Sequence, residues 1–128
     1  MAITTTTIAD PLGTKLIIDS DANADAEDDV TGTGTGKIYA VEIDNSLNSI
    51  PVYVKLCEVA DATSGANGAP WQFPAPAGTK ITYMIGDGVS YLTNLSFWCV
   101  ISPFTTSAES TDAATSPASD VEVKILCT

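Results

Sequence analysis

The apolar residues of this chain occur in short runs that alternate with polar residues, and Gly, Pro, Asn, Asp and Ser separate one run from the next. A period of two residues is typical of strands that bury one face, whereas a helix repeats its apolar positions every three or four residues. Helical periodicity is hard to find in this sequence. The pattern predicts an all-β protein, a single β-sandwich of about seven or eight strands with long loops, immunoglobulin-like or jelly-roll-like.

The alternation also predicts where the strands lie and which side chains face inward. Gly86-Asp87-Gly88 is predicted to form a tight turn, and 45–51 to close a hairpin between the strands on either side of it. Inward faces are predicted for Val52, Val54 and Leu56, for Tyr39, Val41 and Ile43, for Leu95, Phe97 and Cys99, and for Val121, Val123, Ile125 and Cys127. The expected strands cover residues 3–8, 14–19, 37–44, 51–60, 79–85, 89–101 and 120–127. Long loops are expected at 20–36, 61–78 and 102–119, the second running extended with Trp71 and Phe73 tucked in.

The length of 128 residues suits one domain, residues 1–128, in which the Thr-rich residues 1–12 are a candidate N-terminal arm. Sixteen acidic residues against five lysines give a formal net charge of −11. Such a chain repels phosphate, so we expect no binding to nucleic acid or to anionic membranes. The sequence has no basic, apolar leader at its start and no stretch of apolar residues long enough to cross a bilayer, so neither ordinary export nor a membrane anchor is expected.

The chain contains neither histidine nor arginine. Serine–histidine and cysteine–histidine nucleophile pairs are therefore excluded, as are histidine-ligated metal sites and guanidinium clamps. We expect the protein not to be an enzyme. Cys57, Cys99 and Cys127 each lie in strand-like sequence and are expected to be buried free thiols, although a bridge between two of them stays open.

Alternate oxygen-bearing side chains at Asp19, Asp21, Asn23 and Asp25 suit a hard cation such as Ca²⁺, the only cofactor that the sequence suggests. The EF-hand pattern is not met, because Ala24 stands where its glycine is needed and Val30 where its bidentate glutamate is needed. The competing interpretation is a hydrated, mobile acidic loop without metal.

Two blocks carry a resemblance to a known group of proteins. EIDNSLNSIPVYVKLCEVADATSGANGAPWQFPAPAG (42–78) and GDGVSYLTNLSFWCVISP (86–103), the latter followed by a Thr/Ser/Ala-rich tract and a closing strand, resemble small virion proteins of tailed bacteriophages. The resemblance implies a structural component, such as a capsid decoration (cement) protein or a neck or tail accessory. It brings no catalytic residues with it.

We therefore expect a protein on the capsid surface of the virion, and in the host cytoplasm during assembly, that binds the major capsid protein or other virion proteins. A homo-oligomer is compatible with this expectation. The alternative is a tail, neck or fibre module that binds a carbohydrate or receptor through its loops, with calcium as a candidate cofactor. The predicted interface residues are Ile3, Thr5 and Ile8 in the arm, with Trp71 and Trp98 as anchors; Trp98 is expected to point away from the main core.

Overall fold

The computed structural model describes residues 13–32, 34–103 and 115–128. The described residues form strands and no helices, which confirms the all-β prediction. The strands are β1 (Lys15–Asp19), β2 (Gly36–Asp44), β3 (Val52–Cys57), β4 (Trp71–Ala75), β5 (Lys80–Tyr91), β6 (Ser96–Val100) and β7 (Glu122–Cys127). The expected strand at residues 3–8 lies outside the described residues.

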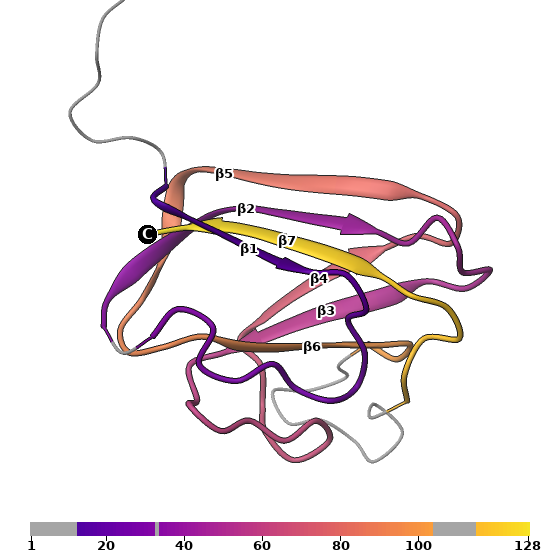
Figure 1. Cartoon of the computed structure of the whole chain (residues 1–128), viewed down its shortest axis with the longest axis horizontal. Coiled ribbons are helices and arrows are strands. Elements are labelled where there is room, and N and C mark those ends of the chain that lie inside the picture. The colour runs from indigo at the N-terminus through magenta and orange to yellow at the C-terminus, as the bar shows by residue number, and fades with distance from the viewer. Residues whose placement is uncertain (1–12, 33, 104–114) are drawn as a thin grey trace, which may run out of the picture.

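The strands pair into two antiparallel sheets that pack as a β-sandwich. One sheet has four strands in the order β1-β7-β2-β5, and the other has three in the order β4-β3-β6. Figure 1 shows the four-stranded sheet in the upper half of the molecule and the three-stranded sheet below it. The two sheets bury their apolar faces against each other, as the alternation in the sequence requires.

The core between the sheets contains the inward faces predicted for β3, β6 and β7. Val54, Cys99 and Ile125, for example, are 0% exposed. Tyr39 is an exception, because it is an extra residue in β2: Ile38 pairs with Cys127 and Ala40 with Leu126, leaving Tyr39 unmatched. This bulge turns Ile38 into the core in place of Tyr39, which is half-buried.

The predicted tight turn at 86–88 is wrong, because these residues lie within β5. They lie between Met84 and Val89, which pair with Ala40 and Ile38 of β2, and so they form the other side of the same irregularity. Gly88 has a φ of +73°, and a Cβ there would lie 2.9 Å from the ring of Tyr39. Glycine therefore allows a bulge here rather than a chain reversal.

The predicted hairpin between residues 37–44 and 51–60 is also wrong. β2 pairs with β5 and β7, whereas β3 pairs with β4 and β6 in the opposite sheet, so residues 45–51 cross between the layers. Asn45 holds this crossover: its buried amide nitrogen donates to the carbonyl oxygens of Ile50 (3.0 Å), Ala75 (3.2 Å) and Pro76 (3.1 Å). Two strands with one apolar face each can bury it by stacking across a core as well as by pairing edge to edge, and their sequence does not distinguish the two arrangements.

Residues 61–78 were expected to be an irregular extended segment, but they contain strand β4. Trp71 pairs with Leu56 and Ala75 with Val52 on β3, and the half-buried aromatic rings of Trp71 and Phe73 pack against the core. Pro74 is compatible with a strand here because β4 is at the edge of its sheet, where a missing N–H breaks no ladder.

Candidate interaction surface

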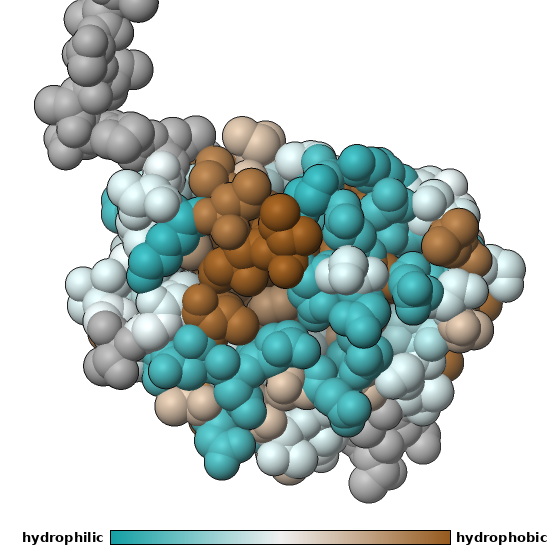
Figure 2. Space-filling model, viewed as in Figure 1, coloured by the Kyte–Doolittle hydropathy of each residue, from teal (hydrophilic) through white to brown (hydrophobic). Residues whose placement is uncertain are grey.

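The outer face of the four-stranded sheet carries a row of apolar side chains that runs across every strand. Leu16 of β1 pairs with Leu126 of β7, which pairs with Ala40 of β2, which pairs with Met84 of β5. Leu16 is 60% exposed and Met84 66%. We call Leu16, Leu126, Ala40 and Met84 the apolar row. Figure 2 shows a hydrophobic area on this side of the molecule, bordered by a hydrophilic one.

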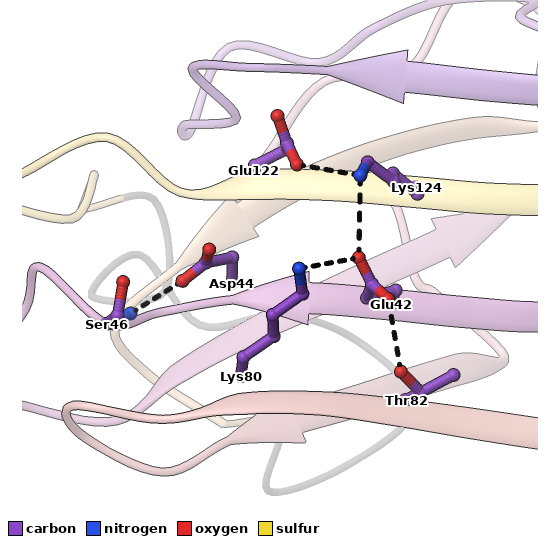
Figure 3. Close-up of polar contacts among 7 residues, drawn as sticks. All are labelled: Glu42, Asp44, Ser46, Lys80, Thr82, Glu122 and Lys124. Carbon is purple, nitrogen blue, oxygen red and sulfur yellow. Dashed lines mark hydrogen bonds and ion pairs between the residues drawn. The ribbon is translucent and has the colours of Figure 1, made fainter.

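Next to the apolar row, the same face carries a network of ion pairs (Figure 3). The Glu42 carboxylate lies 3.3 Å from Lys80 Nζ and 3.6 Å from Lys124 Nζ, and Lys124 Nζ lies 3.1 Å from Glu122. Desolvation by itself would raise the pKa of Glu42, but the hydrogen bond and charge of Lys80, the charge of Lys124 and the hydroxyl of Thr82 together outweigh it and lower this pKa. The lysine charges on this half of the face are therefore matched by carboxylates.

The charges of the described residues are distributed unevenly around the sandwich. The lysines that are not buried, Lys15, Lys37, Lys80 and Lys124, all lie on strands of the four-stranded sheet, whereas Lys55 on β3 is 0% exposed. The segments 20–31 and 58–70 lie together on the lower side of the molecule in Figure 1. They carry seven carboxylates and no lysine: Asp21, Asp25, Glu27, Asp28, Asp29, Glu58 and Asp61. One side of the molecule is therefore strongly acidic and the outer face of the four-stranded sheet is close to neutral.

The backbone of the acidic segment 20–31 is hydrogen-bonded to β6 and to Leu95, which neither interpretation of this run of carboxylates anticipated. Glu27 and Phe97 exchange two backbone hydrogen bonds of 2.8 and 3.0 Å, and the Cys99 N–H donates to the Asn23 carbonyl at 2.8 Å. The Val30 N–H donates to the Leu95 carbonyl, also at 2.8 Å. The segment thus runs along the side of β6 that faces away from β3, and its carbonyl groups accept hydrogen bonds from the backbone N–H groups of Phe97 and Cys99. These hydrogen bonds join backbone atoms and require no alternation of apolar and polar side chains, so the sequence did not indicate them.

The calcium candidates lie along the start of this segment. Asp19 accepts a hydrogen bond from the Asp21 N–H at 3.1 Å, and Asn23 accepts one from the Asp25 N–H at 2.8 Å, so these side chains stabilise local turns. Among the described residues there is no group of three or more Asp, Glu, His or Cys side chains placed to hold a metal ion. Asp21, Asn23 and Asp25 line one side of a polar depression of about 330 Å³, with residues 116–120 on the other side.

The fold changes the titration of Asp19, at the start of this region. Partial burial raises the pKa of Asp19 above its ordinary value of 3.8. The hydrogen bond from the Asp21 N–H opposes this change, and the nearby negative charges of Glu27 and Asp21 add to it. The ionised form of Asp19 is therefore held at a cost in free energy.

The two predicted aromatic anchors lie on opposite faces of the three-stranded sheet. Trp71 packs against the main core, and Trp98 points away from that core, as predicted. Trp98 is nevertheless only 1% exposed, because it lies in a second apolar cluster with Cys57, Ala62, Ala69 and Val100. It is therefore not available as a surface anchor. The other predicted interface residues, Ile3, Thr5 and Ile8, lie outside the described residues.

The three cysteines are buried free thiols, as expected. Burial, together with the nearby charge of Asp19, raises the pKa of the Cys99 thiol to about 12, and burial also raises the pKa of Cys127. Thiols held in this state are poor nucleophiles.

The apolar row was not predicted from the sequence, although the sequence contained a sign of it. Residues 16–18 are Leu-Ile-Ile, which is apolar on both faces of a strand, and Met84 lies out of phase with the inward Ile81 and Tyr83. Only the register brings Leu16 and Met84, 68 positions apart, into one line.

No protein-family model matches the sequence, and no curated protein matches it at a significant level. Within the described residues, no helix is present that is long and apolar enough to span a membrane.

Proposed function

We propose that this protein is a structural component of a bacteriophage virion, a capsid decoration protein that stabilises the shell through protein–protein contacts. The observation that carries the proposal is the apolar row on the outer face of the four-stranded sheet. This face, the attachment face, contacts the shell. The resemblance of residues 42–78 and 86–103 to small virion proteins supports the same conclusion. The partner is the major capsid protein or another virion protein.

The apolar row is chemically suited to adhesion. Leu16 and Met84 keep more than half of their surface exposed, and burying a side chain of this size contributes about 1.5–3 kcal/mol. The neighbouring Lys80 and Lys124 are already paired with carboxylates. Both therefore keep an ionic partner when a bound protein excludes water from this face. Because association itself costs free energy, a patch of this size gives a modest affinity for one copy, and many copies on one lattice add their effects.

The uneven charge sets the orientation of the bound protein. With the near-neutral face against the shell, the seven carboxylates of segments 20–31 and 58–70 point away from it. An acidic exterior keeps crowded copies soluble and repels nucleic acid. The proposed location is therefore the outer surface of the capsid, after assembly in the host cytoplasm.

The test is to bind the purified protein to phage particles that lack it and to determine a density map of the decorated particle. We expect density on the shell at copy numbers that match the capsid symmetry, with the four-stranded sheet facing inward. Leu16→Asp should weaken binding strongly, because it places a charge in the apolar row. The matched control is Leu47→Asp, since Leu47 is 70% exposed but lies in the 45–51 crossover. Equal loss in both variants, or no density on the shell, contradicts the proposal.

The alternative is a tail or fibre module that binds a host carbohydrate, and the polar depression between 21–25 and 116–120 is the observation in its favour. Carboxylates and hydroxyls at a depression suit sugar hydroxyls, directly or through calcium. A glycan array with and without a chelator separates the two functions. Glycan binding that the chelator abolishes, together with absence from the shell, supports the alternative.

A further inference from the structure

The edges of the two described sheets differ in how readily each can pair with another strand. Segment 20–31 already lies along β6 through backbone hydrogen bonds, and β4 contains Pro74, which has no N–H to donate. β1 and β5 are the edges of the four-stranded sheet. β5 is irregular at residues 86–88, opposite the bulge in β2, and such an irregularity opposes pairing along an edge. β1 pairs with β7 in one unbroken register, so it is the regular edge.

The sequence of β1 is complementary to itself when it runs in the opposite direction. Residues 15–19 are Lys-Leu-Ile-Ile-Asp. If two copies of β1 run antiparallel about a two-fold axis at Ile17, Lys15 of each copy faces Asp19 of the other. Opposite charges that face each other across a strand pair attract, and like charges repel. Facing residues are an even number of positions apart, so the backbone groups that β1 directs away from β7 meet the matching groups of the second copy.

On the outer face, this pairing joins two apolar surfaces. Leu16 and Ile18 lie on the same face of β1 and are 60% and 55% exposed. In the antiparallel pair, Leu16 of each copy faces Ile18 of the other. The two-fold axis is perpendicular to the sheet, so the outer faces of both copies lie on the same side and their apolar rows form one strip. Contact between these exposed side chains favours the pair, because it removes apolar surface from water.

On the inner side, the Asp19 carboxylate has no cation beside it in a separate copy. Asp19 and Glu27 both line a groove of about 300 Å³ next to β1. Burial and the charges of Glu27 and Asp21 raise the pKa of Asp19, and only the hydrogen bond from the Asp21 N–H opposes them. Lys15 of the same copy is at the other end of the strand, where its Nζ donates to the Thr31 carbonyl at 2.6 Å. Antiparallel pairing brings Lys15 of the second copy to this carboxylate.

We propose that two copies of this chain associate through their β1 strands, which pair antiparallel about a two-fold axis at Ile17. A second copy fits this edge because its own β1 supplies both the cation that faces Asp19 and the apolar residue that faces Leu16. The net charge of −11 opposes association, so the two Lys15–Asp19 pairs matter for it as well as for the register. The dimer leaves the outer faces uncovered. The inference therefore does not depend on attachment to a capsid.

The first test exchanges the two charges and measures association by sedimentation equilibrium. We expect a monomer–dimer equilibrium for the unchanged chain. Lys15→Asp places carboxylates opposite each other at both ends of the strand pair and should weaken association about tenfold or more. Lys15→Asp/Asp19→Lys restores opposite charges and should bring association back to within about threefold of the unchanged chain. A chain that is monomeric at all concentrations, or a loss that the double variant does not restore, overturns the proposal.

Lys37→Asp is the matched control for Lys15→Asp. Lys37 is also exposed, and its Nζ also donates to a backbone carbonyl, that of Asp87, at 3.0 Å. The change in charge is the same, but Lys37 is on β2, which lies inside the sheet between β7 and β5. The control should associate as the unchanged chain does. Equal weakening in the two variants overturns the proposal, since net charge rather than strand pairing would then control association.

A disulfide test checks the register in folded protein. Chains carrying Leu16→Cys and chains carrying Ile18→Cys are mixed and oxidised. Facing Cα atoms of an antiparallel pair lie about 4.5–5.5 Å apart, within reach of a disulfide, whereas two copies of position 16 are diagonal neighbours about 7–8 Å apart. The mixture should therefore give linked dimers and each variant alone should give few. The native thiols are buried and do not compete. No linked dimer in the mixture, or equal linkage in a single variant, overturns the proposal.

Hydrogen exchange distinguishes a second copy from a segment of the same chain at this edge. If a second copy covers β1, the protection of the amides of residues 16–18 should rise with protein concentration, in step with the dimer fraction. Lys15→Asp should remove this dependence on concentration, and Lys37→Asp should keep it. Protection that is equally strong in a monomeric chain at every concentration means that the chain covers its own edge, which overturns the proposal.

Discussion

Asn48 and Ser119 exchange two hydrogen bonds across 71 positions of sequence. The Asn48 amide nitrogen donates to the Ser119 carbonyl at 3.0 Å, and the Ser119 N–H donates to the Asn48 side-chain oxygen at 2.8 Å. One side chain thereby connects the 45–51 crossover to the chain that enters β7. Because β7 carries Leu126, this contact also helps to hold the apolar row in place.

Asn48→Ala should destabilise the protein by about 1–3 kcal/mol, because it removes the two hydrogen bonds that the buried Asn48 side chain makes with the backbone of residue 119. Asn48 is only 5% exposed, so water does not replace the amide easily. Urea unfolding followed by tryptophan fluorescence measures the change. The neighbouring Ser49 is exposed, and Ser49→Ala should leave the unfolding midpoint unchanged. Equal midpoints for Asn48→Ala and the unchanged protein would mean that the pair contributes nothing.

Asp19→Asn should stabilise the protein at neutral pH. A carboxyl whose pKa is raised on folding favours the folded state while it is protonated, and that contribution is lost as the pH rises from 3.8 through the folded value. The advantage of the variant in melting temperature should therefore be present at pH 7 and should disappear below pH 3.8. Asp61→Asn, which removes the same charge from an exposed position, is the control. An advantage that is the same at both pH values would point to a cause other than ionisation.

Glu42→Gln should have the opposite pH dependence. The pKa of Glu42 is lowered from 4.5 in the folded protein, so its contribution to stability is complete above pH 4.5 and is lost as the pH falls through the folded value. We expect a modestly lower melting temperature for the variant at pH 7, and no difference from the unchanged protein at low pH. Salt should reduce the difference at pH 7, since these are surface ion pairs. Thr82→Val, which removes only the hydroxyl bond, should have the smaller effect.

Trp98→Ala should lower the free energy of unfolding by about 3–5 kcal/mol, because it empties the second apolar cluster. Trp98→Phe keeps most of the contacts and should cost less, so it provides a folded variant if the alanine variant does not fold. Met84→Ala, at a position 66% exposed, should change the free energy by no more than about 0.5 kcal/mol. Denaturant unfolding gives each value. If Trp98→Phe is as stable as the unchanged protein but does not bind the particle, then Trp98 takes part in binding despite its burial.

The sequence predicted which side chains face the core, with Tyr39 at the bulge as the exception, and it failed where neighbours had to be chosen. Val123, Ile125 and Cys127 alternate with Glu122 and Lys124, and the folded chain keeps that alternation, because it reflects burial of one face of a strand. The hairpin predicted at 45–51 was wrong. Asn45 donates hydrogen bonds to backbone carbonyls in the crossover, and the same residue type is equally common in hairpin turns, so its presence does not distinguish the two connections. The strand containing Pro74 was missed, because proline excludes a central strand but not an edge.

The same distinction applies to the candidate interaction surface. The sequence by itself determined the fold class, the inward faces, the buried thiols and the large excess of negative charge, because these follow from local alternation and from composition. Only the tertiary structure decided that Leu16, Leu126, Ala40 and Met84 form one row, that Trp98 is buried, and that β1 and β5 are the edges of the four-stranded sheet. Strand order and register cause this difference: they join residues far apart in the chain, and many registers bury a similar apolar area, so no local pattern specifies them.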